Sequence, residues 1–345
     1  MPGFIISSLV GSELAIDLGT TNTVVYAPGR GIVMHEPSVM AIQERPDGSR
    51  AVISIGQAAK DMMGKTPPQV NTVCPLRHGA VTDSHLVWLL MQHCIKQTIR
   101  SRMGRPLRVI LGVPPGSSAV ECRAMVEPAE AAGANDVCLI YAPLAAALGA
   151  GLAIREPYGH MVVDMGGGRT DIAIISLGDV VSSKTLPLGG EAMDMAVRRM
   201  VRHKYQLDIG VQTAERLKQT LGSMHACAPV QRMLIKGTDS VTGAPRAQKV
   251  LAKDVQAVLV DFLERLIAAI QEVFAATSPE LAADIIETGV TFTGGGALLD
   301  GLIPYVDAAL GFPVQLASEP IACVAMGAGK VFEDPTLRQQ VTMRM

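Results

Sequence analysis

Apolar residues along this chain form short runs that alternate with longer segments in which they recur every three or four positions. The short runs predict β-strands, and they lie at residues 14–17, 23–26, 108–113, 137–140, 160–164, 171–177 and 290–293. The longer segments predict helices, and they lie at residues 81–100, 117–132, 143–152, 189–205, 213–222 and 253–278. This alternation predicts an α/β fold. Residues 237–246 are rich in turn-forming residues and predict a connector.

One short pattern occurs twice, at residues 16–25 (IDLGTTNTVV) and 163–172 (VDMGGGRTDI). Each copy has an apolar residue, Asp, an apolar residue and Gly, and in each a Thr lies six residues after the Asp. Predicted strands flank both turns, whereas the glycine turn of a Rossmann fold opens a helix. A repeat that spans both halves of a chain indicates two related lobes facing each other.

Composition supports two lobes and excludes several classes of protein. A chain of 345 residues is too long for one compact core, and 48% hydrophobic with 18% charged residues is globular rather than disordered. A net charge of −2 argues against bulk binding to nucleic acid. The six cysteines form no C-x-x-C pair and lack zinc spacing, so we expect ordinary thiols in a reducing compartment.

The amino-terminal segment is apolar and uncharged. Residues 1–12 include Phe4, Ile5, Ile6 and Leu9 but no charged side chain. This run is shorter than the roughly 20 residues that span a bilayer, and it lacks the positive start and the cleavage site of a secretory signal. Two interpretations remain: a segment that packs on its own domain, or a short helix that lies in a membrane surface.

The two glycine turns have the chemistry of a phosphate site with a metal ion. Glycine turns expose backbone N–H groups to phosphate oxygens, and Thr20, Thr21, Asn22 and Thr170 add side-chain donors. The carboxylates of Asp17 and Asp164 stand where each turn begins. Carboxylates beside a polyphosphate are natural partners for Mg²⁺, held through its waters.

A third glycine cluster supports the same interpretation. Gly294, Gly295 and Gly296 follow a predicted strand and precede a helix that we expect to start near Ala297. Their backbone allows a phosphate or a flat group to approach closely. Residues 63–66 imitate the end of a P-loop, but Ala59 stands where that motif needs its first glycine.

These motifs resemble the nucleotide clamp of actin, Hsp70 and sugar kinases, and in detail they resemble MreB, the bacterial actin family. The resemblance rests on IDLGTTNTVVY at 16–26, MVVDMGGGRTDIAIISL at 161–177 and TAERLKQTLG at 213–222, and it covers essentially the whole chain. It implies an actin-like (ribonuclease H-like) fold with four subdomains around a central cleft that holds ATP and Mg²⁺. The implied subdomains are IA (1–32, 66–145 and 318–345), IB (33–65), IIA (146–181 and 246–317) and IIB (182–245).

The resemblance also implies the site residues. Asp17 and Asp164 would be the catalytic pair that holds Mg²⁺ through water, and Glu215 and Lys218 match positions near the nucleoside. The nucleotide-binding set would be Gly19, Thr20, Thr21, Asn22, Gly166, Gly167, Gly168, Arg169, Thr170, Glu215, Lys218, Gly294, Gly295 and Gly296.

The family's biology gives further expectations. Its members form antiparallel pairs of protofilaments on the inner face of the cytoplasmic membrane and act with the cell-wall elongation proteins in cell shape. The start of this chain is similar to the membrane-binding start of that family, which favours Phe4, Ile5, Ile6 and Leu9 as a membrane anchor. We therefore expect a cytoplasmic protein that is peripheral to the membrane.

Four positions depart from the family pattern. Ala142 stands where the family carries the Glu that orients the attacking water, and its loss predicts hydrolysis slowed by about 10²–10⁴-fold unless Tyr141 or a neighbour substitutes. Arg169 replaces a usual Thr, and it either pairs with the γ-phosphate or points to solvent. His78 replaces a usual Asp without a clear role. Met103 stands alone where some relatives carry two apolar membrane-inserting residues, which predicts a weaker second anchor.

Two other functions compete with a filament protein. A sugar kinase of the same superfamily needs a catalytic Asp base, for which we find no motif, and an Hsp70 chaperone needs a substrate-binding domain that we do not expect here. Within the first class, the loss of the family Glu favours a specialised paralogue as the alternative to a main shape-determining protein.

Overall fold

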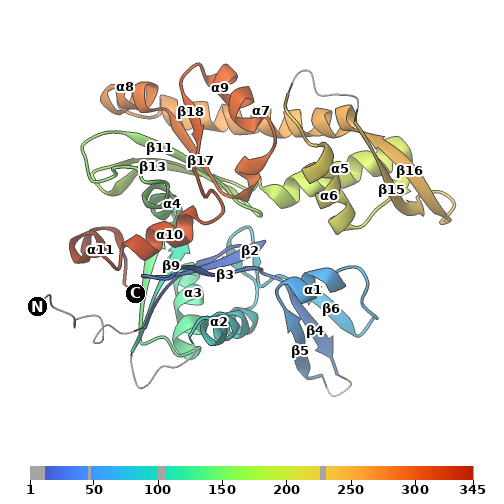
Figure 1. The fold of residues 1–345 in the computed structure, drawn as a ribbon, viewed down its shortest axis with the longest axis horizontal. Helices are drawn as coiled ribbons and strands as arrows, with labels where there is room; N and C mark the ends of the chain where they lie inside the picture. Colours follow the sequence, from blue (N-terminus) through green and yellow to red (C-terminus); the bar gives the residue numbers. More distant parts are fainter. Residues whose placement is uncertain (1–11, 46–47, 100–105, 226–230, 345) are drawn as a thin grey trace, which may run out of the picture.

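The computed structural model describes residues 12–45, 48–99, 106–225 and 231–344, and it has two lobes that each contain a five-stranded sheet (Figure 1). The first sheet has the order β10-β9-β1-β2-β3. Its strands are β1 (Ser12–Leu18), β2 (Asn22–Ala27), β3 (Gly31–Pro37), β9 (Leu107–Val113) and β10 (Asp136–Tyr141). The second sheet has the order β13-β12-β11-β17-β18. Its strands are β11 (His160–Met165), β12 (Thr170–Ser176), β13 (Asp179–Leu186), β17 (Val290–Thr293) and β18 (Val314–Leu316).

The two sheets share one topology. In each, three consecutive strands pair antiparallel, a later strand pairs in parallel with the first of them, and a fifth strand pairs in parallel with that later strand. Counted from that first strand, β1-β2-β3-β9-β10 corresponds to β11-β12-β13-β17-β18. The prediction of two related lobes in an α/β fold is therefore confirmed.

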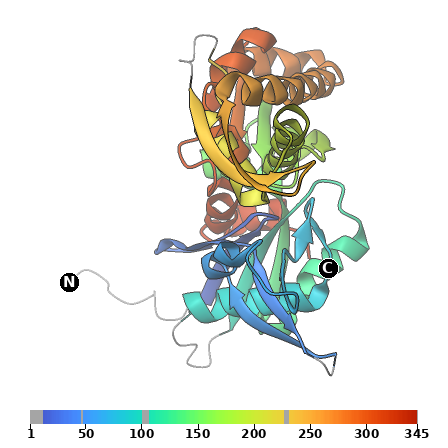
Figure 2. The same ribbon diagram turned by 90° about the vertical axis from the view of Figure 1, so that its right-hand side faces the viewer.

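Helices cover the outer faces of the sheets and fill the space between them (Figures 1 and 2). The first lobe is covered by α2 (Ser84–Thr98) and α3 (Ala119–Ala131), and α7 (Ala252–Ala275), α8 (Pro279–Thr288) and α9 (Leu302–Leu310) belong to the second. Two helices lie between the sheets: α4 (Ala142–Ala150) packs against the second sheet, and α10 (Cys323–Lys330) packs against the first. Helix α11 (Pro335–Val341) follows α10 in the chain. One buried cluster joins residues of both sheets through this helix pair: Ile110, Ile140, Val162 and Ile175.

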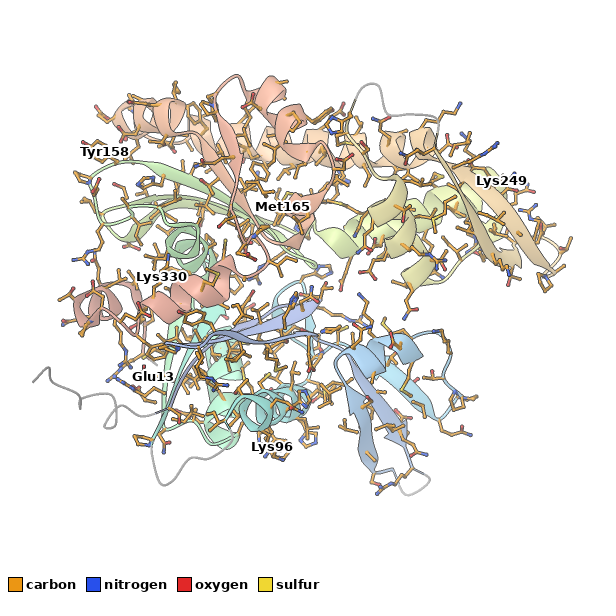
Figure 3. The ribbon with its side chains drawn as sticks, in the orientation of Figure 1. Glu13, Lys96, Tyr158, Met165, Lys249 and Lys330 are labelled. Atoms are coloured by element: carbon orange, nitrogen blue, oxygen red, sulfur yellow. The ribbon has the colours of Figure 1, made fainter. Side chains whose placement is uncertain are left out.

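Small residues allow α4 and α10 to touch backbone to backbone. A Cβ added to Gly149 would lie 1.9 Å from the carbonyl oxygen of Cys323, and one added to Gly327 would lie 1.8 Å from that of Ala145. Lys330, labelled in Figure 3, donates a 2.8 Å hydrogen bond from Nζ to the carbonyl oxygen of Leu148. The two lobes are thus joined by two glycine-packed helices, one after the last strand of each sheet.

Each lobe carries an insertion, and both insertions extend to the same side of the molecule (Figure 1). The first contains β4 (Met40–Glu44), β5 (Arg50–Ile55), α1 (Gln57–Met62), β6 (Val70–Val73) and the small hairpin β7 (Leu76–Arg77) and β8 (Ala80–Val81). The second contains α5 (Gly190–Tyr205), β14 (Leu207–Asp208), α6 (Val211–Leu221), β15 (Arg232–Asp239) and β16 (Pro245–Leu251). Lys249, labelled in Figure 3, lies on β16 of the second insertion.

Two predictions about local structure were wrong. Residues 237–246 form parts of two paired strands, because Gly237 of β15 lies opposite Arg246 of β16, with a turn between them. The residues after the third glycine turn form a 3₁₀ helix, η1 (Gly295–Leu298), and the α-helix begins only at Leu302.

Some expectations stay predictions. The subdomain boundaries are among them, although β3 runs through the expected boundary at 32/33 and β13 through that at 181/182. The apolar segment with Phe4, Ile5, Ile6 and Leu9, and also Met103, lie outside the described residues. Within the described ranges, no helix is both long and apolar enough to cross a membrane.

Candidate functional site

The two repeated turns have the same backbone geometry and face each other across the gap between the lobes. The N–H of Gly19 donates to the carbonyl of Asn22 (3.0 Å), and the N–H of Gly166 donates to that of Arg169 (2.9 Å). A Cβ added to Gly167 would lie 1.7 Å from Oγ1 of Thr21, so a side chain at this position would separate the turns. The repeat therefore builds one site from both lobes.

A cavity of about 540 Å³ opens between these turns, within the range of small-molecule pockets. Its walls include Asp17, Asp164 and most of the predicted nucleotide-binding residues, and insertion residues complete it. The predicted residues that line the cavity are Gly19, Thr20, Thr21, Asn22, Gly166, Gly167, Gly168, Arg169, Glu215, Lys218, Gly294, Gly295 and Gly296. Met165, labelled in Figure 3 near the middle of the molecule, ends the strand that leads into the second turn.

Three carboxylates lie together at the turn end of the cavity. Burial raises the pKa of Asp17 to about 7, and the charge of Asp164 adds to the effect. Burial and then the charge of Asp171 raise the pKa of Asp164 to about 6, although Oγ1 of Thr293 donates to Asp164 Oδ1 at 3.0 Å. Burial and neighbouring negative charge thus disfavour the ionised forms of Asp17 and Asp164, and a bound cation would favour them.

The described residues do not form a metal cage of their own. Within them, no group of three His, Cys, Asp or Glu side chains is arranged to hold an ion. Asp17 and Asp164 therefore fit a cation that keeps most of its water and takes other ligands from a bound phosphate chain.

Arg169 does not point to solvent. Its Nε donates to Oδ2 of Asp171 at 2.7 Å, and only 15% of its side chain is exposed. Asp171 is itself fixed, because Thr185 Oγ1 donates to its Oδ1 at 2.6 Å. Nη1 of Arg169 is buried without a hydrogen-bond partner. The solvent-facing interpretation of Arg169 was wrong.

His78 joins the two lobes, a role that the sequence did not indicate. It lies in the loop between β7 and β8 with a φ of 49°, and its Nδ1 lies 2.7 Å from the carbonyl oxygen of Gly168. The next residue, Gly79, donates its N–H to Oγ1 of Thr20 at 3.2 Å. This loop of the first lobe therefore contacts both glycine turns.

The opposite end of the cavity is formed by helix α6 and its neighbours. Nζ of Lys218 lies 2.8 Å from Oδ1 of Asp194 and donates to the carbonyl of Gly190 at 3.0 Å. Glu215 lies 2.9 Å from Nζ of Lys60, so an ion pair connects the two insertions at this end. Sequence reasoning missed Lys60, Asp194 and Asp171, and only Asp171 gave a signal, as an acidic residue in an otherwise apolar strand.

Thr170 differs from its expected place. It is fully buried, and its Oγ1 donates to the carbonyl of Leu188 at 2.5 Å, so it is absent from the cavity wall. Thr23, its counterpart in the first repeat, is equally buried and bonds to Oγ of Ser38 at 2.8 Å. The Thr that both repeats share therefore anchors each hairpin to its own lobe.

Ala142 lies at the cavity wall beside the turns. It is the first residue of α4 and is 4% exposed. Its methyl group has no hydrogen-bond acceptor. Tyr141, the alternative acceptor, packs against the apolar cores and is absent from the cavity lining.

Comparison with known proteins agrees with this architecture. The family model described as MreB/Mbl protein matches residues 11–340. The chain is 41% identical over 327 residues to the cell shape-determining protein MreB of Escherichia coli K12, covering 94% of each chain. It is 38% identical over 323 residues to the cell shape-determining protein Mbl of Bacillus subtilis, covering 93% of this chain and 96% of that protein.

Solved structures extend the comparison to the fold. MreB5 of Spiroplasma citri bound to AMPPNP superimposes with a TM-score of 0.89 at 34% identity, covering 96% of this chain and 98% of that one. A double helical filament of MamK gives a TM-score of 0.79 at 20% identity, which supports the actin-like fold alone. The resemblance to MreB and the predicted actin-like fold are thus confirmed, and the chain belongs to the MreB/Mbl protein family.

Proposed function

We propose that this chain binds ATP with Mg²⁺ in the cavity between its lobes and assembles into filaments. The observation that carries the proposal is the convergence of the two repeated glycine turns on one cavity, with Asp17 and Asp164 beside them. Structures of the related MreB5 are bound to AMPPNP and to ADP. Gly294–Gly296 and the α6 residues Glu215 and Lys218 would hold the sugar and base.

The cavity wall fits a polyphosphate. Oγ1 of Thr21 and Nη1 of Arg169 are both buried without a partner, and a phosphate chain would supply acceptors to such donors. Asp17 and Asp164 would hold Mg²⁺ through its waters. When bound, the ion would neutralise phosphate charge and reduce the repulsion between the two carboxylates.

Self-association and a cellular role follow from the family. Relatives of this chain are cell shape-determining proteins, and the fold is also that of a filament-forming protein. We propose that antiparallel pairs of protofilaments form on the inner face of the cytoplasmic membrane. Phe4, Ile5, Ile6 and Leu9 would anchor them, and cell-wall elongation proteins would be the partners.

Slow hydrolysis of ATP is the most specific part of the proposal. Ala142 occupies the cavity wall without an acceptor, and Tyr141 does not reach that wall. Water attacking the γ-phosphate would therefore lack a positioning group, which costs about 10²–10⁴-fold in rate. Slow turnover suits a long-lived scaffold and favours a specialised paralogue.

Phosphate release from the purified protein in MgATP tests this part. We expect Ala142→Glu to release phosphate at least about 100-fold faster than the parent chain, the lower end of the range for a general base. Ala142→Leu is the matched control, because it adds bulk but no hydrogen-bond acceptor that could position a water. Equal rates in the parent and in Ala142→Glu, with ATP bound by both, would contradict the role given to Ala142.

Filament formation and membrane binding need separate measurements. Electron microscopy and sedimentation with MgATP, with ADP and without nucleotide test assembly. Co-sedimentation with vesicles containing anionic lipid tests the anchor, and deletion of residues 1–10 is expected to abolish it. Binding that survives the deletion would refute the proposed role of Phe4, Ile5, Ile6 and Leu9.

A further inference from the structure

Three cationic side chains line the cavity within the described residues: Lys60, Arg169 and Lys218. Two of them lie at the α6 end and already face carboxylates, Lys60 that of Glu215 and Lys218 that of Asp194. Arg169 lies at the turn end, where it acts electrostatically on the carboxylates that begin the two turns. It is therefore the cation placed nearest to the far end of a phosphate chain whose nucleoside lies at α6.

The guanidinium of Arg169 is hydrogen-bonded through Nε and packed against the opposite lobe through Nη1. Its Nε is bonded to Asp171, two residues further along the same strand edge, and Asp171 is in turn held by Thr185. A Cβ added to Gly79 would lie 1.3 Å from Nη1 of Arg169, so the group rests against the backbone of the opposite lobe. Any larger residue at position 79 would displace it.

Nη1 remains a buried donor without a partner. Buried donors of this kind are rare, and an ionised one is costlier than a neutral one. Arginine binds phosphate oxygens through a planar fork of donors, and Arg169 has such a fork with Nε held by a carboxylate and Nη1 left unpaired. Three nearby carboxylates would repel an anion at this end of the cavity, so a positive group is needed there if a third phosphate is to enter.

We propose that Arg169 binds the third phosphate of the bound nucleotide and thereby makes the site prefer ATP over ADP. This inference rests on the proposed nucleotide binding and adds a specificity to it. ADP has no third phosphate, so it would leave Nη1 unpaired. MgATP would provide the missing acceptor and offset the carboxylates at the same time.

Dissociation constants for MgATP and MgADP, measured by titration calorimetry on the full chain, test the inference. We expect Arg169→Thr to weaken binding of MgATP by about 10- to 100-fold, the value of one or two hydrogen bonds to a charged group, and to change MgADP by less than about threefold. Arg169→Lys, which keeps the charge but not the fork, is expected to fall between. Arg199→Thr, an exposed site on α5, is the control and should change neither constant.

The outcomes separate the inference from the proposed function. Equal losses for MgATP and MgADP, or no loss for either, would overturn the role of Arg169 while nucleotide binding stands. A parent chain that binds neither nucleotide would overturn both. If Arg169→Thr does not fold, because Asp171 is left unpaired, the ATP-to-ADP ratio of Arg169→Lys decides: an unchanged ratio refutes the inference.

Discussion

The contact between α4 and α10 gives a strong test of the architecture, because one added methyl group has no room there. In Gly327→Ala the new Cβ would lie 1.8 Å from the carbonyl oxygen of Ala145 and 2.7 Å from the amide nitrogen of Gly149. Normal contacts are at least about 3.4 Å, so the helices must separate by about 1.5 Å. Both contacted atoms belong to backbone, and no side-chain rotation relieves the overlap.

The cost can be estimated from opposing effects. Overpacking of this kind destabilises by about 1–3 kcal/mol or more, and the backbone clash places Gly327→Ala at the upper end. Removing a glycine from a helix interior returns about 0.5–1 kcal/mol. We expect a net loss of about 2 kcal/mol, which for 345 residues lowers the melting temperature by roughly 3 °C.

Differential scanning calorimetry of the purified variants measures this loss. Gly149→Ala meets the carbonyl of Cys323 at 1.9 Å and should behave alike. Gly210→Ala is the control, since a Cβ there has nothing within 4 Å and its φ of −73° suits alanine. Gly210 is the N-cap of α6, where alanine is less favourable than glycine, so we expect Gly210→Ala to melt at the parent temperature or about 1 °C below it. A Gly327→Ala protein as stable as that control would refute the close crossing of the two helices.

Two further predictions concern the cavity. The nucleotide-free chain should lose stability as pH rises from about 4 to 7. The pKa of Asp17 is raised from 3.8 to about 7, and between these values the folded form holds a proton that the unfolded form releases; Asp17→Asn should flatten this dependence in thermal melts, and equal slopes would contradict the shift. Lys60→Ala removes the partly exposed ion pair to Glu215 between the insertions, so it should change the free energy of unfolding by less than about 1 kcal/mol. The same variant should release a fluorescent ATP analogue faster than the parent chain. An unchanged release rate would show that the ion pair does not hold the cavity closed.

Much of the two central sheets could be predicted from the sequence, because their strands are short, continuous apolar runs. Strand β12, for example, is buried at every position, so its apolar run predicts a strand without any knowledge of the elements that pack on it. The glycine turns were predictable as well, since their spacing repeats. In the insertions the helices α5 and α6 were predicted, but the strands were not, because they are half-exposed and their burial patterns are irregular, as in β5.

Strand β15 shows why glycine and proline misled the prediction. Gly237 lies inside the strand, where a Cβ would be 2.3 Å from the carbonyl oxygen of Asp208 in β14. Only glycine admits so close a neighbouring backbone, and that neighbour is invisible in a local window of sequence. Pro245 begins β16, a position where its missing N–H is tolerated. Both residues therefore belong to strands of a sheet, although glycine and proline are typical of loops.

The repeat itself explains why the site is asymmetric. Its two hairpins align position by position, so that Asn22 corresponds to Arg169 and Val24 to Asp171. Val24 is buried in an apolar cluster, whereas Asp171, at the same place in the second hairpin, is an equally buried charge paired with Arg169. A buried ion pair in place of an apolar residue seldom adds net stability, so folding does not account for this pair. The phosphate that we propose at Arg169 would account for it, because it would satisfy Nη1, the donor that the described residues leave unpaired.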